Sequence, residues 1–125
     1  MEKSLYNNLL DKEIIPAMTK MREAGQKEYA HDIKNVFANF ERTASILSIK
    51  REKVLMAHFL KHIDGIMAHI EGHKSQRESV TGRITDALVY LTLLWGMLIE
   101  EDSKIDMNVH SFSHPLKNNK NETKS

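Results

Sequence analysis

The sequence contains no cysteine and only five glycines and two prolines among its 125 residues. Without cysteine there is no disulfide, no thiolate nucleophile and no cysteine-based zinc site. The scarcity of glycine and proline leaves few turns, which favours long helices. With 18 basic and 17 acidic side chains the formal net charge is only +1, so the basic excess typical of proteins that bind nucleic-acid polymers is missing as well.

Long apolar segments are also missing. The longest apolar run, residues 87–99, has thirteen residues, whereas a membrane span needs roughly 20. The first residues lack the apolar core of a signal peptide, so we expect a cytoplasmic protein that does not enter a membrane. The length suits one domain with a single core.

Apolar residues recur at helical spacing in four stretches, and no useful strand-like alternation is present. We therefore predict an all-α fold, a compact bundle of about four helices over residues 2–24, 36–47, 49–73 and 78–102. Pro16 predicts a kink or break in the first helix and Gly25 its end. Residues 26–35 then form a loop, and Ser48 is a possible N-cap of the third helix.

The last of these helices is apolar nearly all round beyond its first turns, a pattern typical of a buried central helix. We predict that it also makes a dimer or higher homo-oligomer. Residues 1–104 form the predicted single domain. Residues 105–125 turn polar, and we expect a flexible, disordered tail there.

Arg83, Asp86 and Tyr90 are spaced by three and four residues, so they share one face of the fourth predicted helix. Asp86 can accept a hydrogen bond from a sugar hydroxyl or hold a divalent cation, and Arg83 can bind a phosphate through two nitrogens. Glu78 lies close to the start of the same helix. Alternatively, Arg83 and Asp86 form an ion pair on a solvated face and Tyr90 belongs to the core. The residue types leave both interpretations open.

Four histidines share an arc of about 60° on the third predicted helix. They are His58, His62, His69 and His73. Two pairs spaced by four residues can bind a transition metal, but with no cysteine and no intervening glutamate the pattern favours histidines that border a core. His62 differs from the others because Lys61 precedes it and Asp64 follows, so this group would approach a ligand if the third and fourth helices pack together.

The predicted loop carries Tyr29, and Asn39 follows shortly after it. Aromatic and amide side chains of this kind can stack on a flat base and hydrogen-bond to it. The sequence has no Gly-x-Ser-x-Gly motif, no glycine-rich phosphate loop and no dinucleotide-binding fingerprint. Any hydrolysis would therefore depend on a metal ion held by carboxylates.

Several short motifs together resemble the phage-associated nucleotide-modification-associated domain family, which is itself similar to the MazG-like all-α nucleoside triphosphate pyrophosphohydrolases. In order, the motifs are Lys27-Glu28-Tyr29-Ala30, residues 35–42, Lys61-His62, Glu78-Ser79-Val80 and residues 82–91. The resemblance implies an all-α, often oligomeric domain that binds a nucleotide near helix carboxylates, with Mg²⁺ in members that hydrolyse it. By position it also implies polar site residues, namely Tyr29, Asn39, Lys61, Glu78, Asp86 and Tyr90.

The chain departs from the MazG pattern in its carboxylates. The third predicted helix lacks a Glu-x-x-Glu pair, and Gly82 stands four residues before Asp86, where an acid would complete a second pair. We therefore expect a phage-encoded nucleotide-binding protein with weak or no hydrolysis. Lys61 and Arg83 would face the phosphates, Glu78 and Asp86 the ribose or a cation, and Tyr29 or Tyr90 the base. His62 is a further expected ligand-binding residue.

Three alternatives stay open. One is a Mg²⁺-dependent pyrophosphohydrolase that uses Glu78 and Asp86 as metal ligands. Another is a protein that sequesters a nucleotide immune signal, and the third is a helical protein-interaction module. In each case we expect a homo-oligomer in the cytoplasm of a bacterial or phage-infected cell, and no nucleic-acid polymer as partner.

Overall fold

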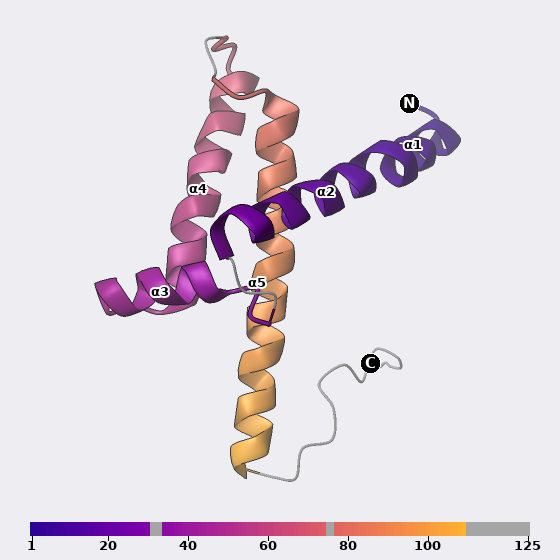
Figure 1. Ribbon diagram of the computed structural model, residues 1–125. Helices are drawn as coiled ribbons and strands as arrows, with labels where there is room; N and C mark the ends of the chain where they lie inside the picture. The colour runs from indigo at the N-terminus through magenta and orange to yellow at the C-terminus, as the bar shows by residue number, and fades with distance from the viewer. Residues whose placement is uncertain (31–33, 75–76, 110–125) are drawn as a thin grey trace. The chain divides into compact units, whose positions relative to one another are not determined.

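The computed structural model in Figure 1 describes residues 1–30, 34–74 and 77–109, with side chains omitted for residues 29, 30 and 105–109. The described chain forms four helices and contains no strand, which confirms the all-α prediction. It divides into two compact units after Thr92, inside the last helix. The site described below lies entirely within the first unit, Met1–Thr92.

The first helix is continuous from Lys3 to Ala30 and changes its hydrogen-bonding pattern twice. The segment α1 (Lys3–Leu9) runs into a π-helical turn, η1 (Leu10–Ile14), and then into α2 (Ile15–Gly25) and a second π-helical turn, η2 (Gln26–Ala30). Pro16 lies in the first turn of α2, directly after η1. The hydrogen-bonding pattern of the backbone changes at this point, so the missing N–H of Pro16 is accommodated without the predicted break in the helix.

The predicted loop over residues 26–35 is wrong in its first half, because α2 ends at Gly25 but the backbone continues as η2. The next two helices are α3 (Ala38–Leu47) and α4 (Arg51–Ile70). Ser48 has a left-handed φ of 56° and terminates α3, and Lys50 occupies the N-cap position of α4. The predicted capping role of Ser48 is therefore wrong, since its backbone conformation ends one helix instead of starting the next.

The turn after α4 depends on a glycine. Gly72 has a φ of 96°, and the N–H of His73 donates to the carbonyl of Ala68 at 3.0 Å. This left-handed closure is the usual way in which glycine ends a helix. The final helix is α5 (Val80–Val109). Ser79 precedes it and caps it, because its Oγ accepts a hydrogen bond from the N–H of Gly82 at 3.0 Å.

The helix α5 extends to Val109, so residues 105–109 of the predicted tail are helical, and residues 110–125 lie outside the described part of the chain. In the first unit the core is formed by buried apolar side chains of α3, α4 and α5 and of the residue before α3. These are Phe37, Phe40, Ala44, Val54, Leu55, Ala87 and Val89.

The prediction that α5 is a buried central helix is wrong. Its exposed large apolar side chains are Ile84, Leu91, Trp95 and Leu98. In a chain of this size the other helices are too few and too short to surround a helix of 30 residues on all sides. Judged by length and composition alone, the segment Val80–Lys104 is one helix that is long and apolar enough to cross a membrane.

Candidate functional site

Five polar side chains come together where α4 and the first turns of α5 meet, and we call them the α4–α5 polar cluster. They are His62, Glu78, Arg83, Asp86 and Tyr90. Helical spacing directs the three α5 members toward α4, and Glu78 immediately precedes the capping residue of α5. The structure thus brings together the cluster predicted on α5 and the histidine singled out on the preceding helix.

His62 lies between two carboxylates. Its Nε2 is 3.6 Å from Oδ2 of Asp86, and its Nδ1 is 3.9 Å from Oε1 of Glu78. Both distances exceed those of a hydrogen bond. The imidazole is 13% exposed, and its Nδ1 is buried without a hydrogen-bond partner in the described structure. A polar atom that is buried in this way needs an explanation, because nearly all such atoms are bonded.

The same three side chains form a set of metal-ligand atoms. One imidazole nitrogen and one carboxylate oxygen from each of Glu78 and Asp86 all lie within 4.8 Å of one another. Nitrogen and carboxylate oxygen are both ordinary ligands of divalent cations. His62 is the only one of the four predicted histidines in this set, and His69 and His73 are exposed on the surface.

Arg83 lies directly over the backbone of α4 at Gly65. A Cβ atom at position 65 would overlap with Cδ, Nε and Nη1 of Arg83. The Nε atom of Arg83 is buried and has no hydrogen-bond partner among the described residues. In one of the two interpretations left open by the sequence Arg83 pairs with Asp86, but the carboxylate of Asp86 faces His62. Gly65 therefore allows the guanidinium to approach α4 closely, a role that its sequence position did not reveal.

The cluster changes the acidity of two groups. Partial burial raises the pKa of the Asp86 carboxyl; His62 and Arg83 oppose this rise and Glu78 reinforces it. Partial burial also lowers the pKa of His58, and electrostatic interactions with Lys61 and His62 lower it further. Both shifts disfavour the charged form, as expected for groups withdrawn from water.

Tyr90 forms the aromatic side of the cluster. Its ring centroid is 5.7 Å from that of His62, and 6.0 Å from that of His58, with which it is stacked. The buried ring of Phe40 meets Tyr90 edge-on at 6.2 Å. These contacts support the His62 imidazole on the side that faces the core. The spacing of the residues did not predict that His58 would join these ring contacts.

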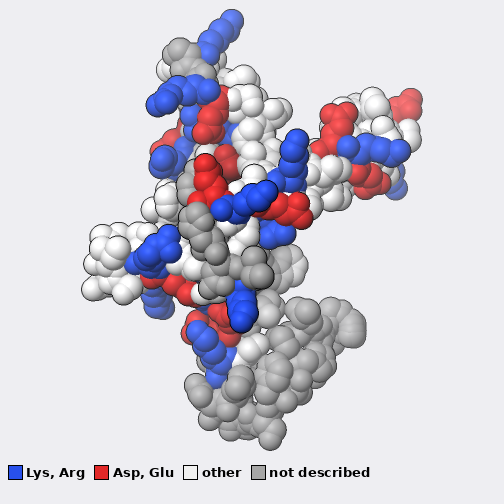
Figure 2. All heavy atoms as spheres, in the orientation of Figure 1, with Lys and Arg blue, Asp and Glu red and all other residues white. Residues whose placement is uncertain are grey.

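The remaining predicted site residues lie elsewhere. Lys61 is exposed on α4, next in sequence to His62, and Asn39 is half-buried on α3. The side chain of Tyr29 lies outside the described part of the chain, although its backbone belongs to η2. In Figure 2, basic and acidic side chains are interspersed over the visible face, in keeping with the low net charge.

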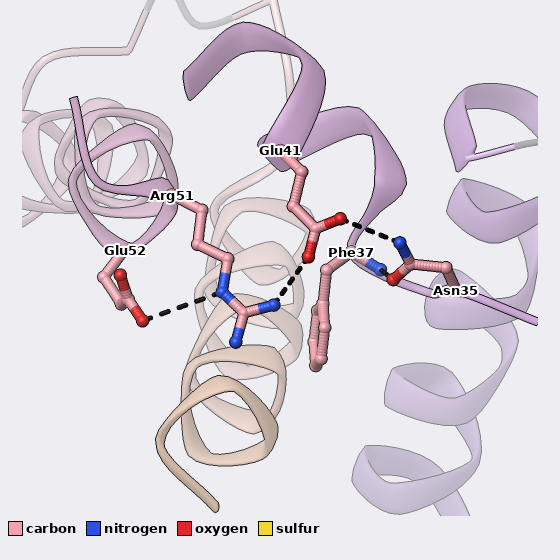
Figure 3. A network of polar contacts seen from close by, with 5 residues as sticks. All are labelled: Asn35, Phe37, Glu41, Arg51 and Glu52. Atoms are coloured by element: carbon pink, nitrogen blue, oxygen red, sulfur yellow. Dashed lines mark hydrogen bonds and ion pairs between the residues drawn. The ribbon is translucent and has the colours of Figure 1, made fainter. Parts of the chain in front are cut away.

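A second polar network joins α3 to α4 (Figure 3). Nη1 of Arg51 is 2.6 Å from Oε2 of Glu41, and the guanidinium lies 5.0 Å from the centroid of the Phe37 ring. Asn35 donates through Nδ2 to the other oxygen of Glu41 at 2.8 Å and accepts from the N–H of Phe37 at 3.1 Å. We call this group the α3–α4 network. Its charged and amide groups bond to one another at short distances, so we interpret it as structural.

Comparison with protein-family models, curated proteins and solved structures finds no match to this chain.

Proposed function

We propose that the protein binds a small phosphorylated ligand of the nucleotide type at the α4–α5 polar cluster. The observation that supports this most is the position of Arg83, which lies over Gly65 with a buried Nε that has no hydrogen-bond partner among the described residues. A guanidinium presents donors in a planar fork that matches a phosphate group. Leaving a buried donor unbonded costs about 1–3 kcal/mol, and a bound phosphate oxygen would recover that energy.

The neighbouring groups suit the rest of such a ligand. The carboxylates of Glu78 and Asp86 can accept hydrogen bonds from ribose hydroxyls, and Lys61 on the adjoining turn of α4 can supply a second positive charge to the phosphates. In this proposal Tyr29 or Tyr90 stacks on the base, and Asn39 is a candidate for hydrogen bonding to it. One small anionic ligand fits this mixture of charges better than a polymer does.

Binding without hydrolysis is our first choice, because Glu78 and Asp86 are the only carboxylates in the described cluster. A protein that sequesters a nucleotide signal needs nothing more. The second candidate is a metal-dependent phosphohydrolase, which is favoured by the three metal-ligand atoms of His62, Glu78 and Asp86. The phage origin, the cytoplasmic location and the MazG-like ancestry belong to the same proposal.

The direct test is thermal unfolding of the full chain with a panel of nucleotides, in EDTA and again with a divalent cation. A ligand that binds only the folded state raises the melting temperature by mass action. We expect one nucleotide class to do so in EDTA, and Arg83→Ala to abolish the shift. Arg22→Ala, a control on α2, should retain it. If no nucleotide shifts the wild-type chain under either condition, the proposal fails and a protein-interaction module is favoured.

Analysis of the recovered ligand separates binding from catalysis. An intact nucleotide supports sequestration. Pyrophosphate release that needs the cation and is lost in Asp86→Asn would instead establish the phosphohydrolase.

We also infer that the protein forms a homo-oligomer through apolar side chains of α4 and α5. In the first unit these are Leu60, Met67, Ile70, Ile84 and Leu91, which are between 41% and 69% exposed. They offer on the order of 500 Å² of apolar surface, a large part of the roughly 800 Å² that each partner contributes to a stable interface. Leu60 and Met67, like Ile84 and Leu91, are seven residues apart, so each pair lies on one helix face.

Light scattering after size-exclusion chromatography tests this inference. Leu91→Gln should reduce the measured mass, whereas Ile46→Gln, which changes an apolar side chain on α3 that is 77% exposed, should not. A wild-type monomer, or a chain that floats with lipid vesicles, would contradict the inference.

A further inference from the structure

We propose that His62, Glu78 and Asp86 bind one Zn²⁺ ion and strongly prefer it to Mg²⁺. This inference deepens the proposed function, since it assigns a cofactor to the same cluster. It also replaces the Mg²⁺ ion that the sequence suggested.

The chemistry of the donor set carries the preference. Mg²⁺ selects oxygen ligands in octahedral geometry and retains several waters, whereas an imidazole nitrogen suits Zn²⁺ and other late first-row metals. His62 supplies the nitrogen here, and it is the least exposed of the three side chains, at 13% against 28% for Asp86 and 52% for Glu78. A metal site that includes His62 is therefore anchored on a nitrogen and differs from a magnesium site.

The three side chains lie near enough to one another to converge on one ion. In a tetrahedral zinc site with bonds of about 2.1 Å, neighbouring ligand atoms are about 3.4 Å apart. Here one nitrogen of His62 and one carboxylate oxygen from each of Glu78 and Asp86 lie within 4.8 Å of one another, so the ligand atoms would have to move closer together to bind an ion. Glu78 precedes α5 and is half-exposed, so a rotation of its side chain can close the site without moving a helix.

Two further observations distinguish this arrangement from an ion pair. The Nδ1 atom of His62 is buried and has no hydrogen-bond partner in the part of the chain that the structure describes, although a carboxylate lies on each side of the ring. In addition, the two carboxylates of the cluster outnumber its one guanidinium, that of Arg83, and a bound cation would offset the remaining negative charge. Contacts of His62 with Tyr90 hold the ring in place, which is the role that surrounding residues normally play at a metal site.

Three protein ligands leave one position of a tetrahedral ion open. Arg83 lies on the same face of α5 as Asp86, so a phosphate oxygen in that open position would also be near the guanidinium. The metal and the phosphate would then bind cooperatively, although each can be measured separately.

The test uses the untagged, full-length chain after dialysis against EDTA. Titration with Co²⁺, followed by visible absorption, reports tetrahedral coordination, and displacement by Zn²⁺ gives affinity and stoichiometry. We expect one Zn²⁺ per chain and at least about 100-fold weaker Mg²⁺ binding. His62→Gln should weaken Zn²⁺ binding by at least about tenfold, and Glu78→Gln should do the same. His69→Gln, which changes an exposed histidine of the same helix, is the matched control.

Circular dichroism verifies that each variant retains its helices, and Glu78→Gln is the safer variant because Glu78 lies outside α5. Equal Zn²⁺ affinity in the wild type and both variants, or equal affinity for Mg²⁺ and Zn²⁺, would overturn the metal site. If zinc binding fails while nucleotides still bind in EDTA through Arg83, only this inference falls. If zinc binds and no nucleotide does, the proposed function falls and the metal site stands.

Discussion

Two groups of polar side chains lie along α4, and they differ in how completely their members are bonded. In the α3–α4 network, Arg51 is 2.6 Å from Glu41 and covers the ring of Phe37, and Asn35 bonds the second oxygen of Glu41. In the α4–α5 polar cluster, the shortest ion-pair distance is 3.6 Å, and buried nitrogen atoms of His62 and Arg83 lack partners in the described structure.

The two arginines show what this difference means. Arg51 is bonded within its own fold, so its interactions contribute to stability whether or not a ligand is present. Arg83 lies over Gly65 with one donor that no described residue bonds, an arrangement that costs stability unless something else supplies the acceptor. Incomplete bonding at a partly buried site is therefore a better indicator of ligand binding than the number of charged residues.

The largest expected effect concerns Arg51→Ala. The side chain is 9% exposed, and its removal leaves Glu41 without its cation and Phe37 without its cover. We expect the free energy of unfolding to fall by about 2–3 kcal/mol, less than for a fully buried pair because Glu41 is 40% exposed. Urea unfolding measures the change, with Lys53→Ala on the exposed side of α4 as the control.

Arg83→Ala should cost clearly less, because it removes a group that is not fully bonded. If Arg83→Ala proves as destabilising as Arg51→Ala, the contrast between the two sites is lost.

The second prediction compares two glycine substitutions. At Gly25 a Cβ meets nothing within 4 Å, so Gly25→Ala should raise the free energy of unfolding by about 0.5–1 kcal/mol through helix propensity. Gly65→Ala should stabilise the protein less, since its Cβ displaces the Arg83 side chain, and it should weaken phosphate binding. Urea unfolding and the nucleotide assay give the two readouts. Unchanged nucleotide affinity in Gly65→Ala would show that the position of Arg83 over α4 is not needed.

The smallest expected effect is the pH dependence due to His58. Because its pKa is lower in the folded state, the unfolded chain takes up this proton more readily, and stability falls as the pH drops below about 6.5. His58→Gln should reduce the loss of stability between about pH 7.5 and about pH 5.5. The effect is small because the ring is partly exposed. His73→Gln, an exposed histidine beyond α4, should leave the loss unchanged in urea unfolding at the two pH values.

Much of the fold could be predicted from apolar spacing, which located four helices and the absence of strands. The errors arose where backbone conformation departs from the regular helix. Ser48 adopts a left-handed conformation, and residues 26–30 form a π-helical turn, neither of which the residue types require. The burial of α5 was also wrong, because apolar composition does not reveal how much partner surface a chain can provide.

For the site, helical spacing placed Arg83, Asp86 and Tyr90 on one face of a helix, and the structure brings Asp86 and Tyr90 together with His62. The pairing of Gly65 with Arg83 and the stacking of His58 on Tyr90 were not predicted. Both are contacts between different helices, and sequence periodicity describes one helix at a time.

The sequence by itself determined the helical class and the residues that each helix presents on one face, because both follow from the spacing of side chains at about 100° per residue. Only the tertiary structure decided which polar groups meet and which stay unbonded. That outcome depends on how closely two helices approach, and here it depends on the missing side chain of Gly65, which lets Arg83 lie against the backbone of α4.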